Sequence, residues 1–470
     1  MQFEAIEHSD PTCAMGHWGI AMTQYQELWG QPEAEALKLG ADEMAIARTF
    51  APQATPRERA YIDALSAFFD PAARTYMARA DAYAAKMDAL HAAFPNDIEG
   101  AAFDALAILA DTPSGDTSLT HEHRALAILE PLFAAYPDHP GLAHYIIHTC
   151  DTPALAREGL PAARAYAKIA PASPHALHMP GHIFARLGLW PDDIASNLAS
   201  VAASGKAMAA HEPGAAHQMH AKEFLVYAYL QVGEDDKARR LTAAMKGLGD
   251  RMEAMPGMDD MKGGGHFFDN ELRAVYALET HDWQGAVRLQ VAPGTSAYDG
   301  FDIYWAQGVA AGHLHDPKLA ATALAAFDRA LDAVKTSPYA SSIGGMLVVR
   351  NELLGWQAVA EGRPDAAVAF MRQAADAQDR HGQNEVDIPA REMLGDVLLM
   401  VHRPDAALSE YRTALKLSPN RLNGLLGAAE AARQSGHAGE ARAFLVTAAR
   451  QTHGGKTSLR PYVRLAIGRA

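Results

Sequence analysis

Cysteine is scarce in this sequence, whose 470 residues include only Cys13 and Cys150. Two thiols cannot form a disulfide framework, and they cannot supply the ligands of a thiolate zinc site or an iron–sulfur cluster. No apolar run reaches the roughly 18 residues that a membrane-spanning helix requires, so we expect no membrane span. A metal site in this chain would therefore use nitrogen or oxygen ligands.

Positive charge is also in short supply. The chain has 41 basic and 56 acidic residues, which give a formal net charge of −15. Because nucleic-acid binding requires a positive surface that neutralises phosphates, we expect no nucleic-acid partner. A cationic ligand or a metal ion is compatible with this charge.

No signal peptide opens the chain, yet the segment from Met1 to Ile6 has the pattern of the middle of an amphipathic helix. We therefore expect a cytoplasmic protein, or a periplasmic one if an upstream leader has been removed. The sequence does not indicate an oligomeric state.

Strand patterns are nearly absent. Alternating β-branched runs are missing, and helix-favouring residues, above all alanine, fill the periodic segments. One pattern recurs roughly every 34 to 48 residues, which is the spacing of helical-hairpin repeats: a helix, a short turn rich in Gly, Asp or Pro, and a second helix with Ala near its start. The turns are at 187–190, 232–235, 280–283, 315–317, 361–364, 402–404 and 436–438. The sequence thus predicts an all-α fold of stacked hairpins.

The segment 405–419 resembles the second helix and terminal proline of a tetratricopeptide (TPR) repeat, and the resemblance is clear from about residue 185 onward. It implies a right-handed α-solenoid with a role in binding or scaffolding. The strings at 13–15, 18–19, 144–148 and 178–180 resemble a bacterial group of long, His-rich TPR-like proteins, a group to which we attach no settled activity.

We divide the chain into three predicted domains. Residues 1–120 form N-terminal helical repeats, whose first hairpin we expect to be truncated. Residues 121–290 form His-rich central repeats that carry a candidate metal site, and residues 291–470 form C-terminal TPR repeats.

Histidine is abundant and unevenly placed: nine of the 22 histidines lie between positions 139 and 220. They fall in sets with helical spacing, so each set shares one helix face. In a TPR array these helices would line the concave surface, where neighbouring repeats bring the sets together. The predicted metal ligands are His144, His148, His178, His182, His217 and His220.

A single histidine on an apolar helix face is usually a core or surface residue. We interpret six histidines in that way: His121, His123, His381, His402, His437 and His453. For the central sets, that reading requires several coincidences of helical phase. Imidazole ligands without thiolate favour copper or zinc, in one centre or in a dinuclear one. Iron is less favoured, because the Glu-x-x-His motifs of di-iron bundles are missing.

Further residues are assigned by their neighbourhood. Glu223, His175 and His266 are candidate catalytic residues, and Glu223, Asp151 and Glu212 are candidate acceptors for distal imidazole N–H groups. His266 follows a glycine-rich segment that could form a lid. Pro180 either kinks a helix spanning 175–186 or marks a helix start.

An N-terminal pair, Cys13 and His17, has the spacing of a thiolate–imidazole nucleophile or of a small buried contact.

The sequence therefore predicts a TPR-fold metalloprotein, an oxidoreductase or hydrolase, with a poly-histidine site in the concave groove. The groove would take a small-molecule or peptide ligand. The alternative is a non-catalytic TPR scaffold that binds peptides or proteins.

Overall fold

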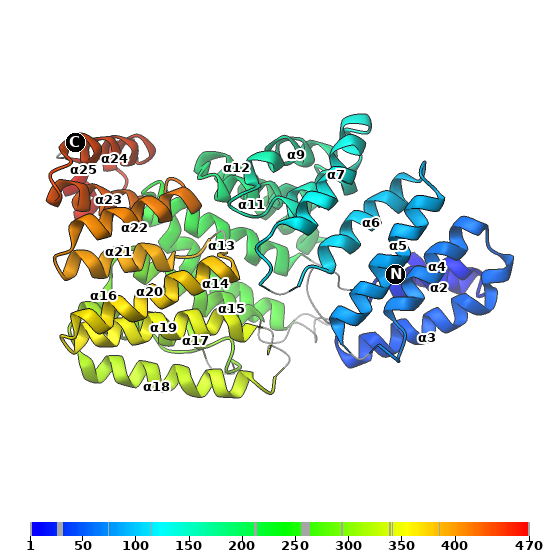
Figure 1. The fold of residues 1–470 in the computed structure, drawn as a ribbon, viewed down its shortest axis with the longest axis horizontal. Helices are drawn as coiled ribbons and strands as arrows, with labels where there is room; N and C mark the ends of the chain where they lie inside the picture. The colour runs from blue at the N-terminus through cyan, green and yellow to red at the C-terminus, as the bar shows by residue number, and fades with distance from the viewer. Residues whose placement is uncertain are drawn as a thin grey trace. The chain divides into compact units, whose positions relative to one another are not determined.

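The computed structural model describes residues 2–25, 32–73, 75–113, 115–210, 214–254, 264–292, 295–337, 340, 342–384 and 386–468. Within these ranges every regular element is helical, so the predicted all-α class is confirmed. Packing divides the chain into two compact units, Met1–Cys150 and Asp151–Ala470 (Figure 1). The three domains expected from the sequence stay a prediction. No helix in the described ranges is long and apolar enough to cross a bilayer.

The Met1–Cys150 unit is a run of α-helices in which each packs against the next. They are α1 (Gln2–Ser9), α2 (Ala14–Met22), α3 (Ala34–Phe50), α4 (Pro56–Phe68), α5 (Tyr76–Ala93), α6 (Ile98–Ala110), α7 (Thr120–Ala135) and α8 (Pro140–Thr149), with a 3-10 turn at Ala51–Gln53. Tyr25 joins the core of this unit, with its ring centroid 4.5 Å from that of Phe68 and 4.8 Å from that of Tyr83.

The Asp151–Ala470 unit continues the pattern with longer hairpins. Its helices are α9 (Ala156–Ile169), α10 (Pro174–His178), α11 (Pro180–Arg186), α12 (Trp190–Ala209), α13 (Ala215–Gln231), α14 (Asp235–Glu253), α15 (Gly264–Glu279), α16 (Trp283–Ala286), α17 (Phe301–His313), α18 (Pro317–Val334), α19 (Ile343–Ala360), α20 (Pro364–His381), α21 (Ala390–Met400), α22 (Pro404–Leu417), α23 (Leu422–Gln434), α24 (Ala438–Gln451), a 3-10 turn at His453–Gly455, and α25 (Pro461–Ile467).

All seven predicted hairpin turns are present, and they share one backbone conformation. Each contains a single residue with positive φ at the same place, and the following residue donates its N–H to a carbonyl five positions earlier. This is the Schellman arrangement that ends a helix and reverses the chain. Glycine supplies the positive φ in four of the turns, at 188, 233, 362 and 436, while His281, His315 and His402 supply it in the other three.

Alternate helices also pack side by side: α13 contacts α15, and the series continues through α17, α19 and α21 to α23. Contact between the first helices of successive hairpins is the packing of a TPR-type solenoid. Glycine residues on these helices permit the close contact. A Cβ on Gly395 or Gly427 would lie only 2.8 or 2.4 Å from the ring of Tyr411, which is wedged between the two helices.

The Asp151–Ala470 unit closes on itself, because its late helices pack back against its early ones. Helix α23 contacts α13. The indole N–H of Trp190 donates to the Asn420 carbonyl at 2.9 Å, and the Leu422 N–H donates to Gln231 Oε1 at 2.8 Å. Residues about two hundred positions apart therefore share one interior.

Arg421 lies at the centre of this closure. Its side chain is 1% exposed, and its guanidinium donates to both carboxylate oxygens of Glu392, at 2.9 and 2.7 Å. It also pairs with Glu279 at 2.7 Å and donates to the Tyr227 hydroxyl. A buried ion pair is favourable only with such complete pairing.

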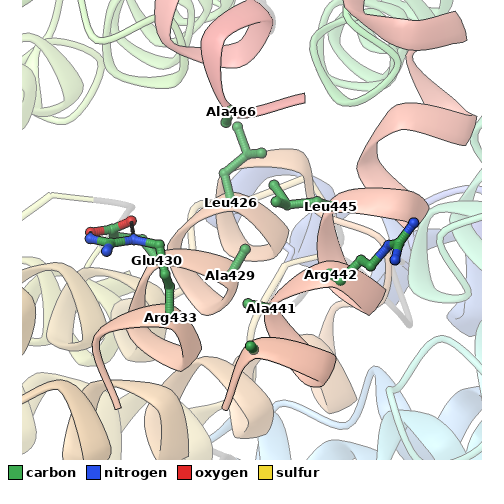
Figure 2. Close-up of a pocket in the computed structure, with 9 residues that line it drawn as sticks. Leu426, Ala429, Glu430, Arg433, Ala441, Arg442, Leu445 and Ala466 are labelled. Atoms are coloured by element: carbon green, nitrogen blue, oxygen red, sulfur yellow. Dashed lines mark hydrogen bonds and ion pairs between the residues drawn. The ribbon is translucent and has the colours of Figure 1, made fainter. Parts of the chain in front are cut away.

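A cavity of about 480 Å³ lies at the C-terminal end of the same unit, between α23, α24 and α25 (Figure 2). Ala429, Ala441 and Leu445 contribute apolar lining, and Arg442 and the Glu430–Arg433 ion pair also border it. None of the histidines singled out from the sequence lines this cavity.

In the Met1–Cys150 unit, His17 is 2% exposed and uses both ring nitrogens. Nδ1 lies 2.7 Å from Glu43 Oε2, and Nε2 lies 2.9 Å from the Pro11 carbonyl. Because both partners are acceptors, the ring is suited to carry two protons. The interpretation of Cys13 and His17 as a nucleophilic pair is therefore not supported by these contacts.

Arg421→Met should lower the free energy of unfolding of the Asp151–Ala470 unit by about 3–5 kcal/mol, because Glu279 and Glu392 would be left as uncompensated buried charges. Urea titration followed by far-UV circular dichroism measures the loss. The matched control is Arg433→Met, which removes an exposed pair with Glu430. It should cost no more than about 1 kcal/mol. Equal losses in both variants would contradict the central role of Arg421.

His17 should make the stability of the Met1–Cys150 unit depend on pH. Burial acts to lower the pKa of His17, but the Pro11 carbonyl and the Glu43 carboxylate raise it above its usual value. The stabilisation relative to His17→Gln should be complete below the unfolded pKa, about 6.5, and should be lost as pH rises through the higher folded pKa. Thermal denaturation from pH 5 to pH 8 tests this, and a difference that grows with pH would contradict it.

Candidate metal centre

Three histidines from three helices of the Asp151–Ala470 unit meet at one point. His178 ends α10, His182 lies in α11, and His220 lies in α13. Both α10 and α11 pack against α13, which brings the rings together. One ligand atom from each ring lies within 4.8 Å of those of the other two, and the Nε2 atoms of His178 and His182 are 3.0 Å apart.

The break between α10 and α11 sets the direction of two of these rings. Met179 separates the helices, and Pro180 takes the first position of α11, where its missing N–H costs no helical hydrogen bond. Of the two sequence-based alternatives for Pro180, the helix start is confirmed. The expectation of one helix face carrying His175, His178 and His182 is wrong, because the segment forms two short helices.

The second nitrogen of each ring has its own acceptor. Nδ1 of His182 donates to Asp151 Oδ2 at 2.9 Å, and Nδ1 of His220 donates to Glu223 Oε2 at 2.7 Å. Histidine ligands of metal ions commonly donate their distal N–H to a carboxylate in this way. The prediction that Asp151 and Glu223 accept imidazole N–H groups is consistent with these contacts.

The third acceptor is an amide whose orientation is fixed by a neighbour. Asn197 Nδ2 donates to Asp193 Oδ1 at 2.6 Å and to the Asp193 carbonyl at 3.1 Å, so Asn197 Oδ1 faces His178. Nδ1 of His178 lies 2.6 Å from that oxygen and must therefore carry the proton. A neutral His178 then has only a lone pair at Nε2.

The same reasoning applies to His182, whose Nδ1 proton is directed to Asp151. When both rings are neutral, two Nε2 lone pairs face each other across 3.0 Å. Such an arrangement is repulsive unless a proton or a metal ion lies between the two nitrogens. Burial, with the positive charges of His220 and His182, lowers the pKa of His178 well below its usual value, so that a proton between the two nitrogens would belong to His182.

Asp151, which accepts from His182, is itself paired with the cationic side chain of Arg186. Burial acts to raise the pKa of Asp151, but the charges of Arg186 and His182 hold it far below its usual range. Arg186 Nε donates to Asp151 Oδ1 at 2.9 Å, so Asp151 stays ionised and oriented toward His182. Phe224 packs against the rings of His178, His182 and His220 at centroid distances of 4.8, 4.9 and 5.3 Å.

Two other predicted residues of this unit form a separate contact. His175 in α10 and His217 in α13 face each other, with ring centroids 5.6 Å apart. His217 is exposed and His175 is half-buried. The ligand atoms that converge at this centre belong to His178, His182 and His220, and His217 is not among them.

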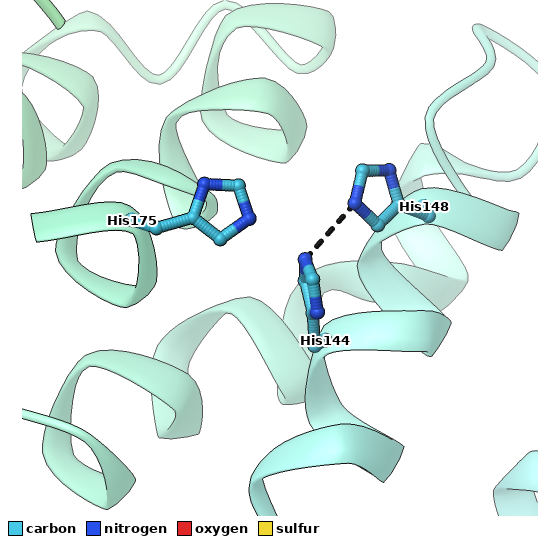
Figure 3. A group of neighbouring side chains, drawn as sticks. All are labelled: His144, His148 and His175. Carbon is cyan, nitrogen blue, oxygen red and sulfur yellow. Dashed lines mark hydrogen bonds between the residues drawn. The ribbon is translucent and has the colours of Figure 1, made fainter. Parts of the chain in front are cut away.

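The remaining predicted ligands, His144 and His148, belong to the Met1–Cys150 unit. They lie one turn apart on α8, with their Nε2 atoms 3.0 Å from each other (Figure 3). Their predicted i, i+4 geometry is therefore present. Their assignment as metal ligands stays a prediction.

The lid predicted around His266 is not seen in the described residues. His266 lies in the first turn of α15, which begins at Gly264, and residues 262 and 263 lie outside the described residues. Its side chain is half-buried. Glu212, a predicted acceptor, also lies outside the described residues.

The sequence reasoning missed Asn197, Arg186 and Phe224. A signal for Asn197 was present: Asp193, Asn197, Ser200 and Ser204 follow one face of α12, and all four are 0% exposed in the structure. A polar row at helical spacing in a long apolar helix indicates buried hydrogen bonding.

Comparisons with known proteins return solved structures of helical proteins. They include the APC/C hetero-tetramer Cut9–Hcn1, which is 15% identical with a TM-score of 0.36, over 92% of this chain and 76% of that one. A human IFIT1 dimer with m7Gppp-AAAA is 12% identical with a TM-score of 0.40, over 93% and 90%. The P58(IPK) TPR domain is 14% identical with a TM-score of 0.25, over 79% and 97%. No family model and no curated protein matches the chain.

The chain is an α-solenoid of TPR-like hairpins. That conclusion rests on the turns and on the packing of alternate helices, because TM-scores this low carry no argument about fold or function.

Proposed function

We propose that this chain is a TPR-fold metalloprotein whose metal ion is bound by the Nε2 atoms of His178, His182 and His220. The observation that carries the proposal is the convergence of these rings while Asp151, Asn197 and Glu223 accept their Nδ1 protons. A metal ion between the rings would accept the lone pairs that face each other when His178 and His182 are neutral. The contacts of the opposite ring nitrogens are those that orient imidazole ligands.

The donor set favours zinc or copper, with iron less favoured, since imidazole suits these borderline ions and no thiolate takes part. Three histidines leave one position open in a four-coordinate site, which is the arrangement of catalytic rather than structural zinc. We therefore infer an enzyme. Such a site supplies Lewis-acid chemistry when it holds zinc and redox chemistry when it holds copper.

Glu223 has two expected roles, as a catalytic residue and as an acceptor of an imidazole N–H. Its carboxylate is 9% exposed and accepts the Nδ1 proton of His220 at 2.7 Å. We therefore assign Glu223 as a positioning residue rather than a catalytic one. Catalytic roles for His175 and His266 stay predictions, and so does a second metal ion at His144 and His148.

Zinc-replete wild-type protein should retain at least about one zinc ion per chain after exhaustive dialysis, as measured by inductively coupled plasma mass spectrometry. His178→Ala and His182→Ala should each lose one equivalent. His437→Ala, at an exposed position outside this centre, is the matched control and should retain it. Copper should be tested in parallel. If wild-type protein binds no metal, the alternative function, a non-catalytic scaffold, is favoured instead.

Glu223→Gln should weaken zinc binding by about tenfold or more, because loss of the negative charge weakens the hold on the His220 N–H. Competition with a chromophoric chelator measures the affinity. Glu430→Gln, at an exposed surface pair, should leave it unchanged. An unchanged affinity in Glu223→Gln would show that the contact with His220 does not support a ligand.

A further inference from the structure

Carboxylates continue from the histidine centre along the stacked helices. Glu223 on α13 is followed by Glu271 on α15, Asp302 on α17 and Glu352 on α19, one from each of four helices that contact in sequence (Figure 1). Asp387, from the connection between α20 and α21, also interacts with Glu271 and Asp302. We call these five residues the acidic cluster.

Glu223, Asp302 and Glu352 are buried, Glu271 and Asp387 are half-buried, and two carboxylate oxygens of the cluster have no hydrogen-bond partner among the described residues. Asp302 is 7% exposed, and its Oδ2 has no hydrogen-bond partner among the described residues. Glu271 Oε2 is likewise buried without one. Glu352 is 2% exposed and accepts the indole N–H of Trp305 at 2.8 Å. Buried carboxylate oxygens without partners cost free energy, so they indicate a group that is bound in use.

The ionisable groups that act on the pKa of Asp302 are all carboxyl groups. Burial, followed by Asp387, Glu223 and Asp299, raises the pKa of Asp302 to about 8. Burial and Asp387 raise the pKa of Glu352 to about 8. Burial raises the pKa of Asp387 to about 6, although the positive charges of Arg421 and Arg186 act to lower it. A bound cation would relieve this repulsion.

Aromatic rings extend from the histidine centre to the cluster. Phe268 lies 6.3 Å from His220 and 5.5 Å from Phe267, whose ring is stacked on Tyr298 at 6.0 Å. Tyr298 lies 5.4 Å from Phe301, the residue before Asp302. Aromatic faces beside carboxylates favour an organic cation, which gains from both.

A metal ion is the competing occupant. His178, His182 and His220 bring their ligand atoms within 4.8 Å of one another, whereas the acidic cluster is not among the described groups that do so. Carboxylates spread over four helices suit a larger cation with several N–H donors.

We propose that the acidic cluster binds the ammonium group of an organic amine whose other end reaches the histidine centre. This inference rests on the proposed function, because it names the substrate class of that metal site. Glu223 joins the two parts, since it accepts the His220 proton and also faces Asp302.

The test is isothermal titration calorimetry of the full-length, zinc-loaded protein at pH 7.5, with n-butylamine and 1,4-diaminobutane as probes and 1-butanol as the neutral match. The amines should bind and the alcohol should not. Asp302→Asn and Glu352→Gln should weaken amine binding by about tenfold or more, since each removes a carboxyl group that can ionise to pair with the bound ammonium. Asp332→Asn, whose carboxylate is 72% exposed, is the matched control and should bind as wild type does.

Two further measurements distinguish amine binding by the acidic cluster from a purely structural role of its carboxylates. Asp302→Asn should raise the melting temperature of the ligand-free protein, because a neutral amide avoids the cost of burying a carboxyl group whose pKa is raised to about 8. Its zinc content should equal that of the wild type. Zinc binding without any preference for the amines over the alcohol would overturn the inference and leave the metal centre standing. Absence of zinc, together with amine binding that responds to Asp302→Asn, would instead overturn the proposed function.

Displacement of the amines by calcium or magnesium at micromolar concentration would identify the cluster as a divalent-cation site and overturn the inference.

Discussion

The ion pairs of Arg421 are the contact on which the Asp151–Ala470 unit depends. A solenoid whose hairpins touch only their neighbours would be open, and its early and late helices would face solvent. Arg421 instead joins the connection between α22 and α23 to Glu279 on α15 and Tyr227 on α13. The Tyr227 hydroxyl donates to the Asp387 carbonyl at 2.7 Å, which holds a second connection, the one between α20 and α21, against α13. The closure therefore places Asp387 among helices that are far from it in the sequence.

The histidine centre and the acidic cluster share one physical character. In each, groups of the same kind are held close together by a scaffold that is otherwise well paired: the Nε2 lone pairs of His178 and His182 in one, and buried carboxylates such as Asp302 in the other. Such arrangements lower stability locally and are typical of sites prepared for a ligand. Their outer contacts are complete, as the bond from Arg186 to Asp151 illustrates. The loss of stability is therefore local to the places where a cation would bind.

Much of the fold was predictable because it depends on local rules. Hairpin turns are specified by helix-ending residues, and all seven predicted turns are present, although His281, His315 and His402 occupy the left-handed position that glycine fills elsewhere. The i, i+4 spacing of His144 and His148 also follows from helix geometry alone. The break at Pro180 was one of two readings that the sequence left open, because proline is compatible with both a kink and a first helical turn.

The sequence by itself determined the helices, their turns and the concentration of imidazole in the central repeats. Only the tertiary structure decided which rings converge: it placed His220 with His178 and His182, and set His217 beside His175. It also supplied Asn197 and the contacts of Arg421, whose partners lie up to 194 positions away in the chain. Periodicity fixes the face of a helix on which a residue lies. The direction of that face within the unit depends on packing between distant segments, which no local pattern encodes.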